Sequence, residues 1–277
     1  MTCGSIATIV CPPDSSVFSP PTEARLTPSH LAVHEAHRFS TAIATKPMPL
    51  PFSVTLFEVM RANKKRTLEG VLFDWDGTLL DSFDADSSAY LAMFREMGIP
   101  WGLDELSVHY SPNWYNVYRA AKIPRARWDA ANLAWRKQYA NHKPKLVSGA
   151  RRLLAWLGRR YRLGLVTSGE RDRVTRQLRY FGLTRGFASR VCADDTTQKK
   201  PHPAPLRLAL KQMNLEPSAC VYVGDSPHDL EMARRAGVRA IAVLGRFPTE
   251  KGLRAAHPEF LLDSLADLPA ILDRLRE

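Results

Sequence analysis

Four short apolar runs recur along the chain from residue 68 onward, and segments with a helical period separate them. The runs cover residues 70–75, 163–167, 219–225 and 238–244. Apolar runs of this length are typical of strands that are buried on both faces of a sheet. Between the runs, apolar residues recur every three or four positions, as they do in amphipathic helices. This alternation predicts an α/β fold in which helices cover both faces of a parallel sheet.

Residues 83–146 interrupt the alternation with helical patterns alone. The expected helices cover residues 85–97, 104–109, 113–121 and 125–141. Pro112 and Pro124 fall at boundaries between them, where proline is tolerated best. We therefore predict an all-helical cap over residues 83–146, inserted after the first strand and large enough to act as a lid. Residues 67–82 and 147–277 would then form the α/β core.

The first 66 residues differ in composition from the rest of the chain. They are rich in proline, serine and threonine, and neither a helical nor a strand period holds for long. Such a segment buries too little apolar surface to offset the entropy lost on ordering. We expect a disordered extension over residues 1–66. Met60 is a candidate start site, so we hypothesise that residues 1–59 are absent from the native protein; acidic residues in the segment argue against a transit peptide.

Bulk composition narrows the class of protein. Apolar residues make up 45% of the chain, as in soluble globular proteins, and no apolar run is long enough for a membrane span. The N-terminus lacks the pattern of a secretory signal. The 4 cysteines form no CxxC pair, which favours reduced thiols. We expect a cytoplasmic protein without a membrane partner.

The chain carries a large excess of positive charge, with a net charge of +11 and a pI of about 9.7. Such an excess attracts anionic substrates and equally suits nucleic acid. The arginines are scattered and form no long basic block. This pattern favours a solvated surface over a nucleic-acid partner. The sequence is compatible with a monomer or a homodimer.

Carboxylates gather where two of the predicted strands end. Asp74 and Asp76 close the first strand, and Gly77 allows the backbone to turn sharply after them. Asp225 and Asp229 follow in the same way at the end of the run over residues 219–225. The carboxyl ends of parallel strands lie at one edge of a sheet, where ligands bind. Carboxylates held so close repel unless a cation or a proton neutralises them, and Mg²⁺ suits them when a phosphate supplies another ligand.

Hydroxyl and ammonium groups are expected at the same edge. Thr167 and Ser168 end the second apolar run, before a helix whose first N–H groups can hold phosphate oxygens. Lys200 precedes a further helix and offers a compact positive charge to a phosphoryl group. Each feature alone is usually only a turn, a helix start or a surface position. Their joint occurrence in this order indicates a site that handles phosphate.

Four motifs built from these residues resemble those of the haloacid dehalogenase (HAD) superfamily. They are FDWDGTL over residues 73–79, VTS over 166–168, KPHP over 200–203 and GDSPHD over 224–229. The match spans about residues 68–277. The spacing resembles the branch with a helical cap between the first two motifs, which includes phosphoglycolate phosphatases and β-phosphoglucomutases. The resemblance implies a Rossmann-like, doubly wound parallel sheet with an inserted all-helical cap domain.

The resemblance also implies catalytic and substrate-binding roles. Asp74 attacks phosphorus and forms an aspartyl phosphate, and Asp76 protonates the leaving group and then activates water. Thr167, with Ser168 beside it, hydrogen-bonds the phosphoryl group. Lys200 neutralises the charge of that group and steadies Asp74.

Mg²⁺ is the cofactor that the resemblance implies. The side chains of Asp74 and Asp225 and the backbone carbonyl of Asp76 would bind the ion. Asp229 would support either the metal site or Lys200.

The expected function is a Mg²⁺-dependent phosphatase of a small phosphorylated metabolite, such as a phosphoglycolate-like compound or a sugar phosphate. A phosphomutase of the β-phosphoglucomutase type and a catalytically silent phosphate-binding regulatory protein are the alternatives. Asp76 argues against dehalogenation, because release of a halide needs no acid. Side chains of the cap, among them Asp86, Tyr110 and Trp135, either line a substrate pocket or pack the core of the cap, so the substrate stays open.

Overall fold

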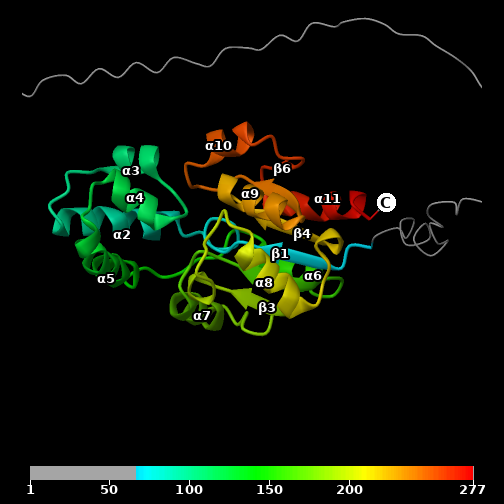
Figure 1. The fold of residues 1–277 in the computed structure, drawn as a ribbon. Coiled ribbons are helices and arrows are strands. Elements are labelled where there is room, and N and C mark those ends of the chain that lie inside the picture. The colour runs from blue at the N-terminus through cyan, green and yellow to red at the C-terminus, as the bar shows by residue number, and fades with distance from the viewer. Residues whose placement is uncertain (1–66, 277) are drawn as a thin grey trace, which may run out of the picture. The chain divides into compact units, whose positions relative to one another are not determined.

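One parallel sheet of six strands organises residues 67–276, the part of the chain that this computed structural model describes (Figure 1). The strands are β1 (Gly70–Phe73), β2 (Arg162–Val166), β3 (Ser189–Val191), β4 (Cys220–Gly224), β5 (Arg239–Val243) and β6 (Leu261–Leu262). They lie in the order β3-β2-β1-β4-β5-β6, and every neighbouring pair is parallel. The predicted α/β fold with a doubly wound parallel sheet is therefore confirmed. The extension predicted over residues 1–66 lies outside the described residues.

The predicted apolar runs correspond to β1, β2, β4 and β5, the four inner strands of the sheet. The outer strands β3 and β6 were not predicted, because they contain only 3 and 2 residues. Strands so short leave no hydrophobic period that a sequence pattern can detect.

Six helices belong to the sheet-forming part of the described chain. They are α6 (Ala150–Leu157), α7 (Arg171–Tyr180), α8 (Ala204–Met213), α9 (Pro227–Ala236), α10 (Glu250–Ala255) and α11 (Leu268–Arg274). Within residues 67–276, no helix combines the length and the apolarity that crossing a bilayer requires.

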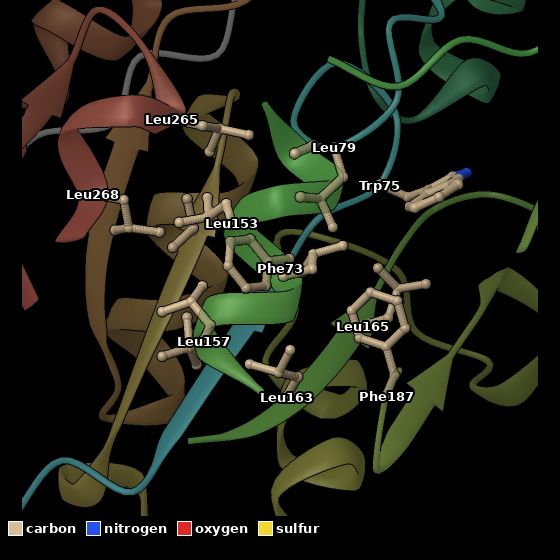
Figure 2. Close-up of a cluster of buried hydrophobic side chains, with 14 of the residues drawn as sticks. Phe73, Trp75, Leu79, Leu153, Leu157, Leu163, Leu165, Phe187, Leu265 and Leu268 are labelled. Atoms are coloured by element: carbon tan, nitrogen blue, oxygen red, sulfur yellow. The ribbon is translucent and has the colours of Figure 1, made fainter. Parts of the chain in front are cut away.

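Side chains of β1 alternate between two buried clusters on opposite faces of the sheet. Val71 and Phe73 pack with residues of α6 and α11, whereas Leu72 packs with residues of α8 and α9. Figure 2 shows the first cluster, in which Phe73 lies beside Leu153 and Leu165. Burial on both faces explains the unbroken apolar run of β1, since neither face meets water. It also fixes the carboxyl end of the strand, from which Asp74 follows.

The segment after β1 forms four helices that pack on one another. They are α2 (Phe83–Glu96), α3 (Leu103–His109), α4 (Trp114–Ala120) and α5 (Trp128–Tyr139). These helices share a hydrophobic core of their own, which includes Met93, Phe94 and Val117. The helical content agrees with the sequence pattern, and the domain limits at residues 83 and 146 stay a prediction.

The chain segments that lead into and out of these helices run side by side. Leu80 forms an isolated antiparallel bridge with Leu146. The backbone N–H of Asp81 donates to the carbonyl of Lys145 at 2.9 Å, and that of Val147 donates to the carbonyl of Leu79 at 2.9 Å. The helical insertion therefore leaves the core and returns to it through one paired connection.

We expect Leu165→Ala to lower the free energy of unfolding by about 2–5 kcal/mol, because its side chain is fully buried on β2. Leu133→Ala on α5 is the matched control. The side chain of Leu133 is 67% exposed, so this change should alter the free energy by less than about 0.5 kcal/mol. Denaturant titration of both variants measures the difference, and equal effects would contradict the assignment of the core.

Candidate active site

Three carboxylates converge where β1 and β4 end. Asp74 follows β1, Asp225 follows β4, and Asp229 lies in the first turn of α9. The strands are neighbours, and the backbone N–H of Asp74 donates to the carbonyl of Val223 at 2.9 Å. One oxygen of each carboxylate lies within 4.8 Å of the others, and all three side chains are buried. This is the edge of the sheet where the sequence predicted a site.

Lys200 lies at the centre of this cluster. Its Nζ donates to Oδ1 of Asp74 at 2.6 Å, to Oδ1 of Asp229 at 2.7 Å and to the hydroxyl of Tyr222 at 2.8 Å. The Lys200 side chain is only 4% exposed, so its charge is held by these three partners and not by water. Tyr222 was not predicted as a member of the site, because it lies within β4 and its hydroxyl reaches the cluster only in the folded chain.

Burial strongly influences ionisation in this cluster. Loss of water raises the pKa of Asp74 to about 7, and the charge of Lys200 opposes part of that rise. Burial also raises the pKa of Asp225 well above its usual range, with further contributions from the charges of Asp74 and Asp229. The pKa of Lys200 is raised even though burial alone lowers it, because Asp229 and Asp74 outweigh burial. The carboxylates therefore resist ionising together unless another positive charge joins them.

The donor set suits a metal ion. Buried carboxylate oxygens of Asp74, Asp225 and Asp229 lie close enough to share one. Both oxygens of Asp229 are already engaged, since Oδ1 accepts from Lys200 and Oδ2 accepts from the hydroxyl of Ser226 at 2.5 Å. Asp74 and Asp225 therefore have the oxygens that are freer to bind an ion, and hard oxygen ligands of this kind favour hard cations.

Glycine is required at position 77 by the approach of Asp225. Gly77 has a φ of +84°, and a Cβ atom there would lie 2.1 Å from Oδ2 of Asp225. The next residue, Thr78, donates its hydroxyl to Oδ1 of Asp225 at 3.2 Å. Thr249 donates to the backbone carbonyl of Asp225 at 2.6 Å. The turn after β1 thus leaves room for this carboxylate and orients it.

The side chain of Asp76 is bound by Arg173 of α7. Nη1 and Nη2 of Arg173 donate to the two oxygens of Asp76 at 2.8 and 2.7 Å. Trp75, between the two aspartates, points away into the core, where its Nε1 donates to Gln177 at 2.8 Å. The side chain of Asp76 is 24% exposed, against 9% for Asp74. The two aspartates therefore occupy different environments, one beside Lys200 and one beside Arg173.

Sequence reasoning missed Arg173, which we grouped with the scattered surface arginines. Its side chain is only 14% exposed. Burial alone would lower the pKa of Arg173, but Asp76, with smaller contributions from Tyr139 and Asp86, raises that pKa well above its usual range. Position 173 lies five residues beyond the VTS motif and carries no signal of its own, so only the folded chain reveals the pairing.

Thr167 and Ser168 follow β2, the other neighbour of β1. The Thr167 hydroxyl accepts a hydrogen bond from the backbone N–H of Gly169 at 2.9 Å. Thr167 is buried, whereas Ser168 is half-buried. Both line the same pocket as Asp74 and Lys200. The fold thus brings all the residues predicted from the motifs to one place, and their individual roles stay predictions.

The pocket is lined by both the sheet edge and the helical insertion. From the core come Asp74, Asp76, Thr167, Ser168, Arg173, Lys200, Asp225, Asp229 and Phe247. From the helical insertion come Asp86, Tyr90, Tyr110, Trp114, Tyr118, Asn132, Trp135 and Arg136. A ligand at the carboxylate cluster would therefore also meet the side chains of α2, α4 and α5.

Comparison with known proteins agrees with this geometry. The family model of haloacid dehalogenase-like hydrolases matches residues 71–243. Pyrophosphatase PpaX of Oceanobacillus iheyensis is 25% identical over 210 residues, which is 74% of this chain and 97% of the relative. The chain belongs to the haloacid dehalogenase-like hydrolase family.

Solved structures share the fold. A provisionally named phosphoglycolate phosphatase from Lactobacillus plantarum superposes with a TM-score of 0.68 at 24% identity, over 74% of this chain and 99% of that one. A provisionally named β-phosphoglucomutase from Thermotoga maritima superposes with a TM-score of 0.59 at 24% identity, over 74% and 99%. The resemblance that the four motifs suggested is confirmed, and the chain is a haloacid dehalogenase-like hydrolase with a parallel α/β core.

We expect a divalent cation to raise the melting temperature, and to raise it more as the pH increases through about 7. The pKa of Asp74 is about 7 in the folded protein and 3.8 when unperturbed. Between these values the folded state binds more protons than the unfolded state, so the stability of the metal-free protein falls as pH rises. A bound cation replaces the proton and relieves this loss, which makes its effect larger at high pH.

Thermal unfolding from pH 5 to 8, with and without Mg²⁺ or Ca²⁺, measures this effect. Asp225→Asn should lose most of the cation-induced shift, and Asp263→Asn, an exposed position remote from the cluster in sequence, should keep it. A shift that is equal at every pH, or equal in Asp225→Asn, would contradict a metal site here.

Proposed function

We propose that this protein is a Mg²⁺-dependent phosphatase that hydrolyses a small phosphorylated metabolite through an aspartyl phosphate on Asp74. The observation that carries the proposal is the buried cluster of Asp74, Asp225, Asp229 and Lys200 at the adjoining ends of β1 and β4. Membership of the hydrolase family supports it. Phosphoryl transfer depends on positioning and on charge neutralisation, and this cluster supplies both.

In the first step, an oxygen of Asp74 attacks phosphorus and the bond between phosphorus and the leaving oxygen breaks. Asp76 gives a proton to that oxygen, so that the product leaves as an alcohol. Lys200 balances the negative charge of the phosphoryl group and holds Asp74 by its other oxygen at 2.6 Å. Thr167 and the backbone N–H groups after β2 orient the phosphoryl oxygens.

In the second step, water attacks the phosphorus of the aspartyl phosphate. Asp76, which gave up its proton in the first step, now takes a proton from this water. The acyl phosphate bond breaks, inorganic phosphate leaves, and the carboxylate of Asp74 is restored. A single aspartate can serve as acid and then as base because the two steps need opposite protonation states.

The residues present fit Mg²⁺ as the cofactor. Asp74, Asp225 and the backbone carbonyl of Asp76 would hold it, with Thr78 and Thr249 orienting Asp225. The ion would supply positive charge to the phosphoryl oxygens and would relieve the repulsion between the buried carboxylates.

The default substrates are a phosphoglycolate-like compound or a sugar phosphate. The name of the PpaX relative adds pyrophosphate to this set. A phosphomutase would use the same cluster but would require a sugar bisphosphate, because the phosphoryl group must be returned to the substrate. A silent phosphate-binding protein would bind the same ligands without turnover.

We expect wild type to release phosphate from at least one member of a panel of phosphorylated metabolites, or from a generic aryl phosphate, when Mg²⁺ is present. Asp74→Asn should lower the rate by about a thousandfold or more, because the nucleophile is lost. EDTA should abolish release. Asp263→Asn makes the same chemical change at an exposed position and should leave the rate unchanged.

Each contrary result points to a different alternative. Phosphate release that survives Asp74→Asn would rule out the aspartyl phosphate. Turnover only with a sugar bisphosphate would indicate a mutase. No turnover of any compound, together with phosphate binding by calorimetry, would indicate a silent binder.

We also expect Arg173→Met to slow the hydrolysis of substrates with poor leaving groups more than that of substrates with good leaving groups. Arg173 holds both oxygens of Asp76, and an alkyl phosphate depends on that aspartate for a proton whereas an aryl phosphate depends on it little. The value of kcat should fall by about tenfold or more with an alkyl phosphate and less with an aryl phosphate. Arg176→Met, an exposed position on the same helix, is the control. Equal losses with both substrates would contradict a role through Asp76.

A further inference from the structure

The basic side chains that line the described pocket already have acidic partners. Lys200 is bound to Asp74 and Asp229. Arg173 uses its two terminal nitrogens on Asp76, and Arg136 is bound to Glu170, with its Nε at 3.0 Å from the carboxylate. Among residues 67–276, the pocket lining therefore offers no unpaired cation beyond the phosphoryl site. A second anionic group on the substrate would enter without a countercharge.

Unlike these basic residues, the acidic residue Asp86 has no partner of opposite charge. It lies on α2 and lines the pocket, yet no hydrogen bond or ion pair joins its carboxyl group to any described residue. Burial raises the pKa of Asp86 to about 8, the charge of Asp76 adds to the rise, and the charge of Arg173 opposes it. In its protonated form this carboxyl group can both donate and accept a hydrogen bond.

Aromatic side chains line the same pocket as this carboxyl group. Tyr90 lies one helical turn after Asp86 on α2, and Tyr110 also lines the pocket. Tyr110 stacks on Phe247, with ring centroids 4.8 Å apart. Tyr90 meets Trp135 edge to face at 6.2 Å. Rings of this kind present apolar surface to the carbon skeleton of a ligand.

Two residues of the pocket lining contain a buried polar atom that lacks a partner among the described residues. The indole nitrogens of Trp114 and Trp135 are buried and have no hydrogen-bond partner among the described residues. A buried donor without a partner is unfavourable. The lining that the helical insertion contributes is mainly aromatic, and among the described residues Asp86 is its one carboxyl group.

We propose that this side of the pocket recognises an uncharged, hydroxyl-bearing leaving group, such as that of a sugar or polyol phosphate, and that Asp86 selects it by hydrogen bonding. The inference rests on the proposed phosphatase function and narrows its substrate class. A hydroxyl group can donate to Asp86 or accept from it. The second anion of phosphoglycolate, pyrophosphate or a sugar bisphosphate would find no basic group that lacks an acidic partner.

The test compares kcat/KM for matched substrates in the Mg²⁺-loaded enzyme. A hexose 6-phosphate and sorbitol 6-phosphate represent the proposed class, phosphoglycolate and pyrophosphate carry a second anion, and an aryl phosphate reports the catalytic cluster alone. In wild type, the best hydroxylated substrate should exceed both dianionic ones by about tenfold or more, since unpaired buried polar groups discriminate strongly.

Three variants test whether Asp86 is the residue that selects the substrate. Asp86→Leu keeps a similar shape but removes the polar group, and should lower kcat/KM for the hydroxylated substrate by about tenfold or more. Asp86→Asn keeps a donor and an acceptor and should retain most of the activity. Asp129→Leu, at an exposed position on α5, should have no effect. Asp86→Leu should lose much less activity with the aryl phosphate than with the hydroxylated substrate, and the aryl phosphate activity that remains also shows that the variant folds.

The outcomes separate this inference from the proposed function. A wild-type preference for phosphoglycolate or pyrophosphate would overturn the inference and leave the phosphatase intact. An equal loss of aryl phosphate hydrolysis in Asp86→Leu would also overturn it, because Asp86 would then act on the whole site. No hydrolysis of any substrate by wild type would overturn the phosphatase proposal, and the inference with it.

Discussion

The ammonium group of Lys200 between two buried carboxylates is the interaction on which the rest of the site depends. Without it, Asp74 and Asp229 would face each other in a dry interior, where like charges repel strongly. With it, Asp229 is fully engaged by Lys200 and Ser226, and Asp74 keeps one oxygen free. Asp225 remains the carboxylate without a basic partner, so the charge of the cluster is completed only when a cation or a proton arrives. The same imbalance makes the cluster suited to a metal ion and to a phosphoryl group.

The sheet makes this arrangement possible. β1 and β4 are buried on both faces by clusters that contain Phe73 and Tyr222, so the ends of both strands are held in fixed register. Asp74 and Asp225 leave those ends in the same direction. Tyr222 has a second role, since its ring packs in the core while its hydroxyl reaches Lys200. Positioning of the charged groups thus comes from hydrophobic packing beneath them.

Much of the fold and of the candidate site could be predicted from the sequence, for identifiable physical reasons. Strands buried on both faces leave apolar runs, and residues at the carboxyl ends of such strands must meet, which placed Asp74, Thr167 and Asp225 together. β3 and β6 were missed because they are too short to show a period. The role of Arg173 was missed for another reason. An arginine is exposed far more often than buried, and no local pattern records which carboxylate it will meet.

The paired connection below the helical insertion joins the helices to the backbone that carries Asp76. Asp76 bridges to Leu80, and Leu80 bridges in turn to Leu146. Any rotation of the helices about these two segments would therefore pull on the backbone that carries Asp76. Arg173 of the core holds the side chain of the same aspartate, so Asp76 lies between the core and the segments that lead into the helices. In such an arrangement, binding of the correct substrate under the helices would also align the carboxyl group of Asp76 for proton transfer.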